Sequence, residues 1–232
     1  MPRHPHSVFD EPNFSPQPFV REVSEQEVWC EPGLLPNVSP AASSQTYAVL
    51  LRERWLNASP AVSCLTVAGL ALAAGPFAIL SAFMKTSSPS FVIAAVIVGP
   101  LVEELGKVAA PLITLERWPY RFISGTQPVL VCAISGLVFS FIENLLYLHL
   151  CARDFGPAYA AWRWSVCTVL HVGCSLIAGL GLRRVWLAAR AGCSRPDISA
   201  AANYLITAIA IHGSYNAVVL LLQGSHLLSF GK

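Results

Sequence analysis

The chain has 232 residues, of which 54% are hydrophobic and only 12% are charged, with a formal net charge of +2 and a mean hydropathy of +0.55. Soluble domains carry about a quarter charged residues, so this composition indicates a membrane protein. The small net charge gives no support to a nucleic-acid partner.

Residues 1–61 differ in composition from the rest of the chain. They hold nine of the seventeen prolines and most of the acidic residues, and they lack the early apolar stretch of a cleavable signal peptide. We interpret them as a Pro-rich, largely disordered tail with one short helix around Thr46–Leu56.

Five apolar runs follow, and each exceeds the roughly 20 residues that a transmembrane helix needs. They are residues 62–84, 91–115, 128–150, 162–187 and 200–222. Because isolated spans of this length cannot close a barrel, they must be helices. The predicted fold is therefore all-α and polytopic, with about five transmembrane helices in a single domain of residues 62–232.

The distribution of Lys and Arg predicts the orientation of these spans. With the N-terminus in the cytoplasm, ten arginines would lie on the inner side and four basic residues on the outer side, while Lys107 lies within the membrane. We expect an integral protein of the cell (plasma) membrane with a cytoplasmic N-terminus.

Polar residues occur at membrane depth in four successive predicted spans. They are Glu103, Glu104 and Lys107 in the second, Glu143, Asn144 and Tyr147 in the third, His171 in the fourth, with Arg163 near its outer end, and His212 and Asn216 in the fifth. A charge at the bilayer centre costs roughly 2.5–3.5 kcal/mol, so these side chains must face protein or water. We expect one polar intramembrane cavity, with the first helix contributing only packing or anchorage.

Helical spacing relates some of these residues. Glu103 and Lys107 are four apart and share one face, whereas Glu104 is rotated by about 100° from Glu103. One carboxylate can therefore face the cavity while the other meets Lys107 or another helix. Each pair also has a purely structural explanation, as a buried ion pair or as a hydrogen bond that links helices.

The residue types allow three kinds of chemistry. A carboxylate in an apolar pocket can act as a general base toward water, while imidazole and carboxamide groups can stabilise an oxyanion. His and Glu can also hold zinc, although the sequence has no HExxH and no CxxC. Ion or proton transport uses the same residue types.

These residues resemble the motifs of the PrsW-type intramembrane proteases, in the superfamily of the CAAX-processing endopeptidases and bacterial self-immunity proteins. The matching positions are Glu103, Glu104 and Lys107, then Phe139, Glu143, Asn144 and Tyr147, then Arg163, His171 and Gly179, and finally His212 and Asn216. The resemblance covers residues 91–222 and implies that residues 62–232 form a protease domain.

The resemblance implies an intramembrane endopeptidase that acts on membrane-associated proteins, for instance in regulated proteolysis. Glu103 would activate water with help from Glu104, and His212 and Asn216 would stabilise the oxyanion. His171 and Glu143 would position the water or the glutamate pair, with Lys107, Tyr147 and Arg163 in support. The alternatives are a small proton- or ion-coupled transporter and a non-catalytic membrane scaffold.

Relatives of this type have been described both as metalloproteases and as glutamate-type proteases. We favour a metal-free site, because a carboxamide such as Asn216 is a poor zinc ligand and the Lys107 ammonium would compete with a divalent cation. If zinc is bound, the expected ligands are Glu143, His171 and His212. The sequence predicts no cofactor and does not indicate the substrate or the oligomeric state.

Overall fold

The computed structural model describes residues 47–86, 90–151 and 156–227. The chain forms two compact units, residues 1–47 and 48–232, and all of the described residues except Tyr47 belong to the second. Most of the predicted tail lies outside the described residues, as do Arg153 and Lys232, which we expect on the outer side.

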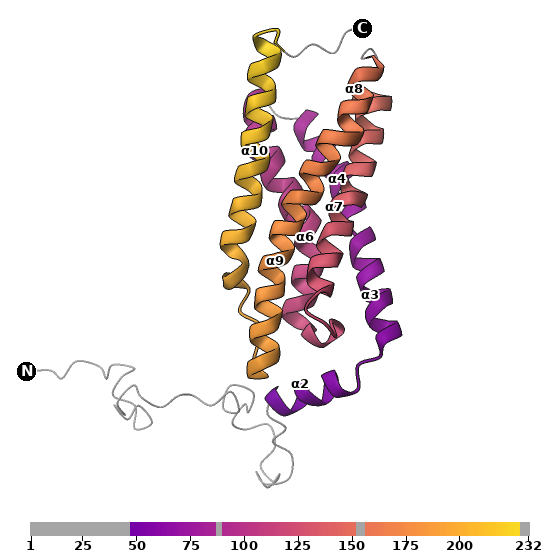
Figure 1. Cartoon of the computed structure of the whole chain (residues 1–232), viewed down its shortest axis with the longest axis vertical. Helices are drawn as coiled ribbons and strands as arrows, with labels where there is room; N and C mark the ends of the chain where they lie inside the picture. Colours follow the sequence, from indigo (N-terminus) through magenta and orange to yellow (C-terminus); the bar gives the residue numbers. More distant parts are fainter. Residues whose placement is uncertain (1–46, 87–89, 152–155, 228–232) are drawn as a thin grey trace, which may run out of the picture. The chain divides into compact units, whose positions relative to one another are not determined.

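Every regular element in the described ranges is helical (Figure 1). The first elements are α2 (Tyr47–Leu56), α3 (Pro60–Leu72), α4 (Ala74–Thr86), α5 (Phe91–Ile93), the π-helical turn η2 (Ala94–Val98), α6 (Gly99–Arg117) and the 3₁₀ turn η3 (Pro119–Arg121). Then follow α7 (Gln127–Leu146), the π-helical turn η4 (Tyr147–Cys151), α8 (Pro157–Trp162), the π-helical turn η5 (Arg163–Cys167), α9 (Thr168–Gly192), the 3₁₀ turn η6 (Ile198–Ala201) and α10 (Ala202–Gly224).

Local sequence explains several helix ends. Ser59 caps α3 and Pro60 occupies its first turn, where the missing N–H has no cost. Helix α9 ends at Gly192, and the capping residue Cys193 has a φ of 45°, the left-handed conformation that commonly closes helices. Pro111 lies inside α6 without interrupting it.

Four helical stretches in the described part of the chain are long and apolar enough to cross a membrane. They are Pro60–Met84, Gln127–Leu150, Pro157–Gly192 and Ile198–Gly224. The remaining predicted span is also helical, from Phe91 to Arg117, but its three central charges make its composition less apolar. The prediction of an all-α, polytopic membrane protein is confirmed.

Helices α7 and α9 pack against each other at the centre, and α3, α4, α6 and α10 surround them (Figure 1). Val131 and Cys132 of α7 pack with Leu182 and Val185 of α9 in the main apolar core. Helix α10 is more peripheral, since only 17% of its apolar stretch is buried. Large apolar side chains remain exposed on the outer faces of the helices, as expected of a surface that faces lipid.

Helix α2 is the short helix expected before Pro60, and it packs against the helical bundle. Its Leu51 and Trp55 are buried, and the Trp55 ring meets Trp186 of α9 edge to face at 6.3 Å. Both indoles donate to the carbonyl oxygen of Phe122, at 3.2 Å from Trp55 and 3.1 Å from Trp186. These bonds join α2, α9 and the α6–α7 connection.

Candidate active site

Five of the helical segments bring buried polar side chains together inside the bundle. The residues are Ser81 of α4, Glu103, Glu104 and Lys107 of α6, Glu143 and Asn144 of α7, Arg163 and His171 of the η5–α9 segment, and His212 of α10. Each is no more than 7% exposed. The four successive predicted spans therefore do contribute to one polar interior.

Glu104 lies at the centre of this cluster. Its Oε1 accepts a hydrogen bond from the Lys107 ammonium and another from Nδ1 of His212, both at 2.6 Å. Its Oε2 accepts no hydrogen bond from any described residue. Glu104 is therefore the carboxylate that meets Lys107, one of the arrangements that the spacing allowed.

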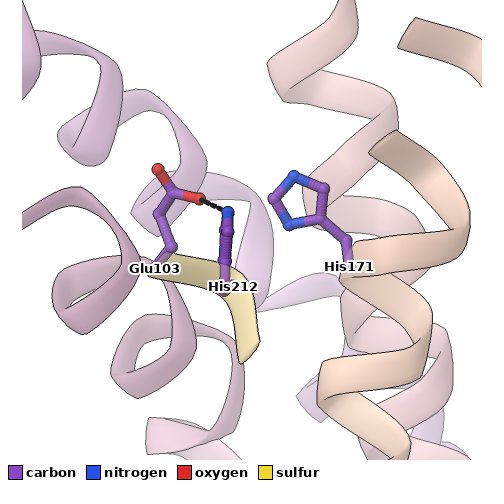
Figure 2. A group of neighbouring side chains, drawn as sticks. All are labelled: Glu103, His171 and His212. Carbon is purple, nitrogen blue, oxygen red and sulfur yellow. Dashed lines mark ion pairs between the residues drawn. The ribbon is translucent and has the colours of Figure 1, made fainter. Parts of the chain in front are cut away.

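Glu103 points toward His212 from the same helix (Figure 2). Its Oε2 lies 3.6 Å from Nε2 of His212, and its Oε1 accepts a hydrogen bond of 3.0 Å from Ser81. Because Nδ1 of His212 donates to Glu104, the neutral ring would turn a lone pair on Nε2 toward Glu103. A proton or a cation between these two atoms would satisfy both of them.

His171 stands across from His212, with ring centroids 5.0 Å apart and the rings nearly perpendicular (Figure 2). Lys107 donates to its Nδ1 at 3.2 Å, so Nδ1 must be an acceptor. The proton of the neutral ring is therefore on Nε2, which donates to Oε2 of Glu143 at 3.0 Å. These contacts define both the tautomer and the orientation of His171.

Arg163 contacts three other residues of the site at once. Its NH2 group donates to Oε2 of Glu143 at 2.8 Å, and its Nε donates to Oδ1 of Asn144 at 3.0 Å. The guanidinium also lies over the Tyr147 ring, 4.1 Å from the centroid. Arg163 therefore fixes the position of the Glu143 carboxylate. The contacts with Asn144 and the Tyr147 ring in turn fix the position of the guanidinium.

Helix α10 reaches the cluster through a close approach to η2. A Cβ at Gly213 would lie 2.6 Å from the carbonyl oxygen of Val96, so only glycine fits there without displacement. Asn216 donates from Nδ2 to the carbonyl oxygen of Ala95 at 2.8 Å. These contacts hold the adjacent His212 against α6. They also use one N–H of the Asn216 amide, which we expected to donate to an oxyanion.

A cavity of about 160 Å³ lies beside this cluster. Glu143, His171, His212 and Asn216 line it, together with Tyr147, Tyr159, Trp162, Arg163 and Tyr215. Glu103 and Glu104 are fully buried and are not among its lining residues. The turns η2, η4 and η5 all contribute to the wall, and π-helical turns of this kind are frequent at functional sites.

The first predicted span contributes a hydrogen-bond donor to the site, although we expected no polar contribution from it. We expected this helix to supply only packing, but Ser81 of α4 donates directly to Glu103. A serine in an apolar helix is common and inexpensive, so it gives no sequence signal. Asn144 was noticed as a polar residue, yet its contact with Arg163 depends on how α7 packs against η5.

The donor atoms fit a metal ion. One nitrogen of His171, one nitrogen of His212 and one oxygen of Glu103 all lie within 4.8 Å of one another. Two histidines and a glutamate form a common catalytic zinc set, and each histidine here donates its other nitrogen to a carboxylate, as metal-bound histidines usually do. Glu103 thus replaces Glu143 in the set that we expected for zinc. The Lys107 ammonium, however, contacts the same Nδ1 of His171 that would bind the ion.

The fold and the site define a polytopic all-α membrane protein with buried acid and base residues beside an internal cavity. A family model described as PrsW family intramembrane metalloprotease matches residues 52–230. The chain therefore belongs to the PrsW family of intramembrane proteases. No curated protein and no solved structure matches it.

Proposed function

We propose that this protein hydrolyses peptide bonds of membrane-associated proteins with a water molecule that Glu103 activates. Membership of the PrsW family supports peptidase activity. The observation that carries the residue assignment is the 3.6 Å approach of Glu103 Oε2 to His212 Nε2, beside a cavity lined by His212, His171 and Glu143.

Charge balance supports an acid–base role for this pair. Among the described residues, the buried cluster contains three carboxylates, Glu103, Glu104 and Glu143, and two permanent cations, Lys107 and Arg163. An excess negative charge in a low-dielectric interior is costly, so the cluster should hold one further proton, either on a carboxylate or on a histidine. We place this proton on His212, which leaves Glu103 ionised as a base.

The reaction then follows from the positions of these groups. Because Glu103 is fully buried and does not line the cavity, the His212 side chain must first move aside to admit water and the scissile bond. The water then attacks the scissile carbonyl carbon and transfers a proton to Glu103. The carbonyl oxygen becomes an oxyanion, which accepts a hydrogen bond from protonated His212 Nε2 and from the remaining N–H of Asn216. As the C–N bond breaks, Glu103 returns the proton to the leaving amine.

His171 and Glu143 serve as positioning groups in this proposal. The bonds from Lys107 to His171 and from His171 to Glu143 hold a neutral imidazole at the cavity wall. Arg163 compensates Glu143 and Lys107 compensates Glu104, so both carboxylates are less suited than Glu103 to act as a base. Glu104 orients His212 through the bond to Nδ1.

A metal-dependent version is the second candidate, and the compact donor set of Glu103, His171 and His212 favours it. Zinc held there would polarise the carbonyl group and acidify bound water. We favour the metal-free form because the Lys107 ammonium already contacts His171 Nδ1 and would repel a divalent cation.

Transport is less well supported by the arrangement. A proton or ion path would distribute Glu and His side chains through the depth of the membrane, whereas hydrolysis requires them within a few ångströms of each other. Here Glu103, His212 and His171 gather at one position. We further propose a plasma-membrane location with a cytoplasmic N-terminus, which follows from the loop arginines.

Reconstitution with candidate substrates tests the proposal. The purified chain in liposomes would be incubated with a panel of labelled single-span membrane proteins from the same cell. Glu103→Gln should abolish cleavage of any protein cut by the wild type, because it preserves shape and removes the base. Glu116→Gln on the same helix is the matched control and should retain activity. Undiminished cleavage by the Glu103→Gln protein would refute the role of Glu103.

A further inference from the structure

A second cavity, of about 240 Å³, lies at the end of the bundle where α2 meets α3. Its lining residues come from the end of α2, the start of α3 and the turn η3, and they are Arg54, Asn57, Ala58, Ser59, Val62, Ser63, Tyr120 and Arg121. None of them lines the active-site cavity. The second cavity therefore needs an explanation separate from catalysis.

Two arginines converge on one aromatic ring in this cavity. The guanidinium of Arg54 lies 5.8 Å from the centroid of the Tyr120 ring, and that of Arg121 lies 6.0 Å from it. Neither arginine forms an ion pair within the described ranges. Among the described residues, no acidic side chain lines the cavity, so its described lining carries a net positive charge.

Hydrogen bonds across the bundle hold the walls of the cavity. The hydroxyl of Ser63, only 2% exposed, donates to the carbonyl oxygen of Arg121 at 2.7 Å, and Gln127 donates to that hydroxyl at 2.8 Å. The next carbonyl, of Phe122, accepts from both Trp55 and Trp186. The two arginines therefore project from backbone segments that are joined to each other.

The position of the cavity relative to the apolar spans indicates its ligand. The first span begins at Pro60, directly beyond Ser59, and α6 ends at Arg117, just before Tyr120. The cavity thus lies where hydrocarbon gives way to the headgroup layer. Phosphate is the anion concentrated at that level, and guanidinium groups bind it through charge-assisted hydrogen bonds.

We propose that this cavity binds the phosphate of an anionic glycerophospholipid. Arg54 and Arg121 bind the phosphate oxygens, while Ser59 and Tyr120, which also line the cavity, offer hydroxyl groups to the polar part of the headgroup. A bound lipid would join α2 to the start of α3 and to η3, so it would stabilise this end of the bundle. The proposal does not depend on the protease mechanism.

Native mass spectrometry of the full chain in mild detergent, titrated with short-chain phosphatidylglycerol, tests the site. The variant pair Arg54→Gln with Arg121→Gln removes both cavity cations. The control pair Arg52→Gln with Arg117→Gln removes two exposed arginines near the same end that do not line the cavity. Each charge-assisted hydrogen bond is worth about tenfold or more in affinity, so the cavity pair should weaken binding at least about tenfold more than the control pair.

Two competitors identify the source of the phosphate. Short-chain phosphatidylcholine should displace phosphatidylglycerol poorly, and inorganic phosphate at equal concentration should not displace it. Equal losses in the two variant pairs would show diffuse surface attraction and overturn the proposal. Displacement by inorganic phosphate would show a free-anion site and overturn the lipid assignment. If the double cavity variant does not fold, each single variant must lose more affinity than Arg52→Gln or Arg117→Gln, and equal losses again refute the site.

Discussion

Ser81 of α4 donates a hydrogen bond of 3.0 Å to Oε1 of Glu103 on α6, inside the membrane-spanning bundle. Both side chains are almost completely buried, at 1% and 0% exposure. The hydroxyl therefore holds one oxygen of the carboxylate, while the other oxygen faces His212. The first span takes part in the site through this bond.

Replacing Ser81 by alanine should slow cleavage about tenfold or more with little change in KM, because a hydrogen bond to a buried carboxylate is worth about 1.5–3 kcal/mol. Steady-state kinetics in liposomes would measure kcat and KM separately. The control is Ser175→Ala on α9, which removes an equally buried hydroxyl that has no described hydrogen-bond partner. Equal kcat values for the two variants would exclude a positioning role for Ser81.

Lys107 should stabilise the fold through its ion pair with Glu104. Lys107→Gln leaves the Glu104 carboxylate buried without its cation, which should lower the free energy of unfolding by about 3–5 kcal/mol. The double variant Glu104→Gln with Lys107→Gln removes both charges and should unfold at a higher temperature than the single variant. Thermal unfolding in detergent would compare them, and a less stable double variant would contradict the ion-pair interpretation.

Arg163 should not tolerate lysine. The guanidinium contacts Glu143, Asn144 and the Tyr147 ring at the same time, and an ammonium cannot reproduce this planar arrangement. We expect Arg163→Lys to lose about 2–3 kcal/mol of stability and most of the activity. Arg184→Lys, at an exposed position of α9, serves as the control and should be neutral in the same unfolding and cleavage assays.

Two glycines, near His212 and His171, should respond differently to alanine. A Cβ at Gly213 would meet the Val96 carbonyl at 2.6 Å, so Gly213→Ala should move α10, displace His212 and lower activity by more than about tenfold. Gly173, two residues from His171, has no atom within 4 Å of such a Cβ. Gly173→Ala should keep activity and gain up to about 1 kcal/mol from helix propensity. Equal activities for the two variants would refute the tight α10–η2 contact.

The metal question has a direct test. Under the metal-free proposal, purified active protein should contain far less than one zinc per chain and keep its activity in a chelator. Lys107→Met should bind zinc more tightly than the wild type, because the ammonium that contacts His171 Nδ1 is gone. Elemental analysis and zinc titration would measure both quantities. Stoichiometric zinc, with activity lost to a chelator and restored by added zinc, would establish the metal-dependent version.

The sequence by itself determined the class of the protein. Span length and apolar composition are local properties, so the runs at residues 62–84 and 128–150 could be recognised as membrane helices without knowledge of their neighbours. Charged side chains in such helices are costly, which is why Glu103 and His212 were noticeable as candidate site residues. The order of these motifs also led to the PrsW family, which the family match confirms.

The tertiary structure alone decided which atoms meet. Spacing along one helix places Glu103 and Lys107 on the same side, but the rotation and depth of α4, α7, α9 and α10 determine their partners in space. Packing brings Ser81 to Glu103, Glu104 to His212, and Glu143 to both His171 and Arg163. It also leaves Glu103 outside the lining of the cavity, which His212 does line. Such contacts join residues far apart in the chain, and no local pattern encodes them because they depend on how whole helices fit against one another.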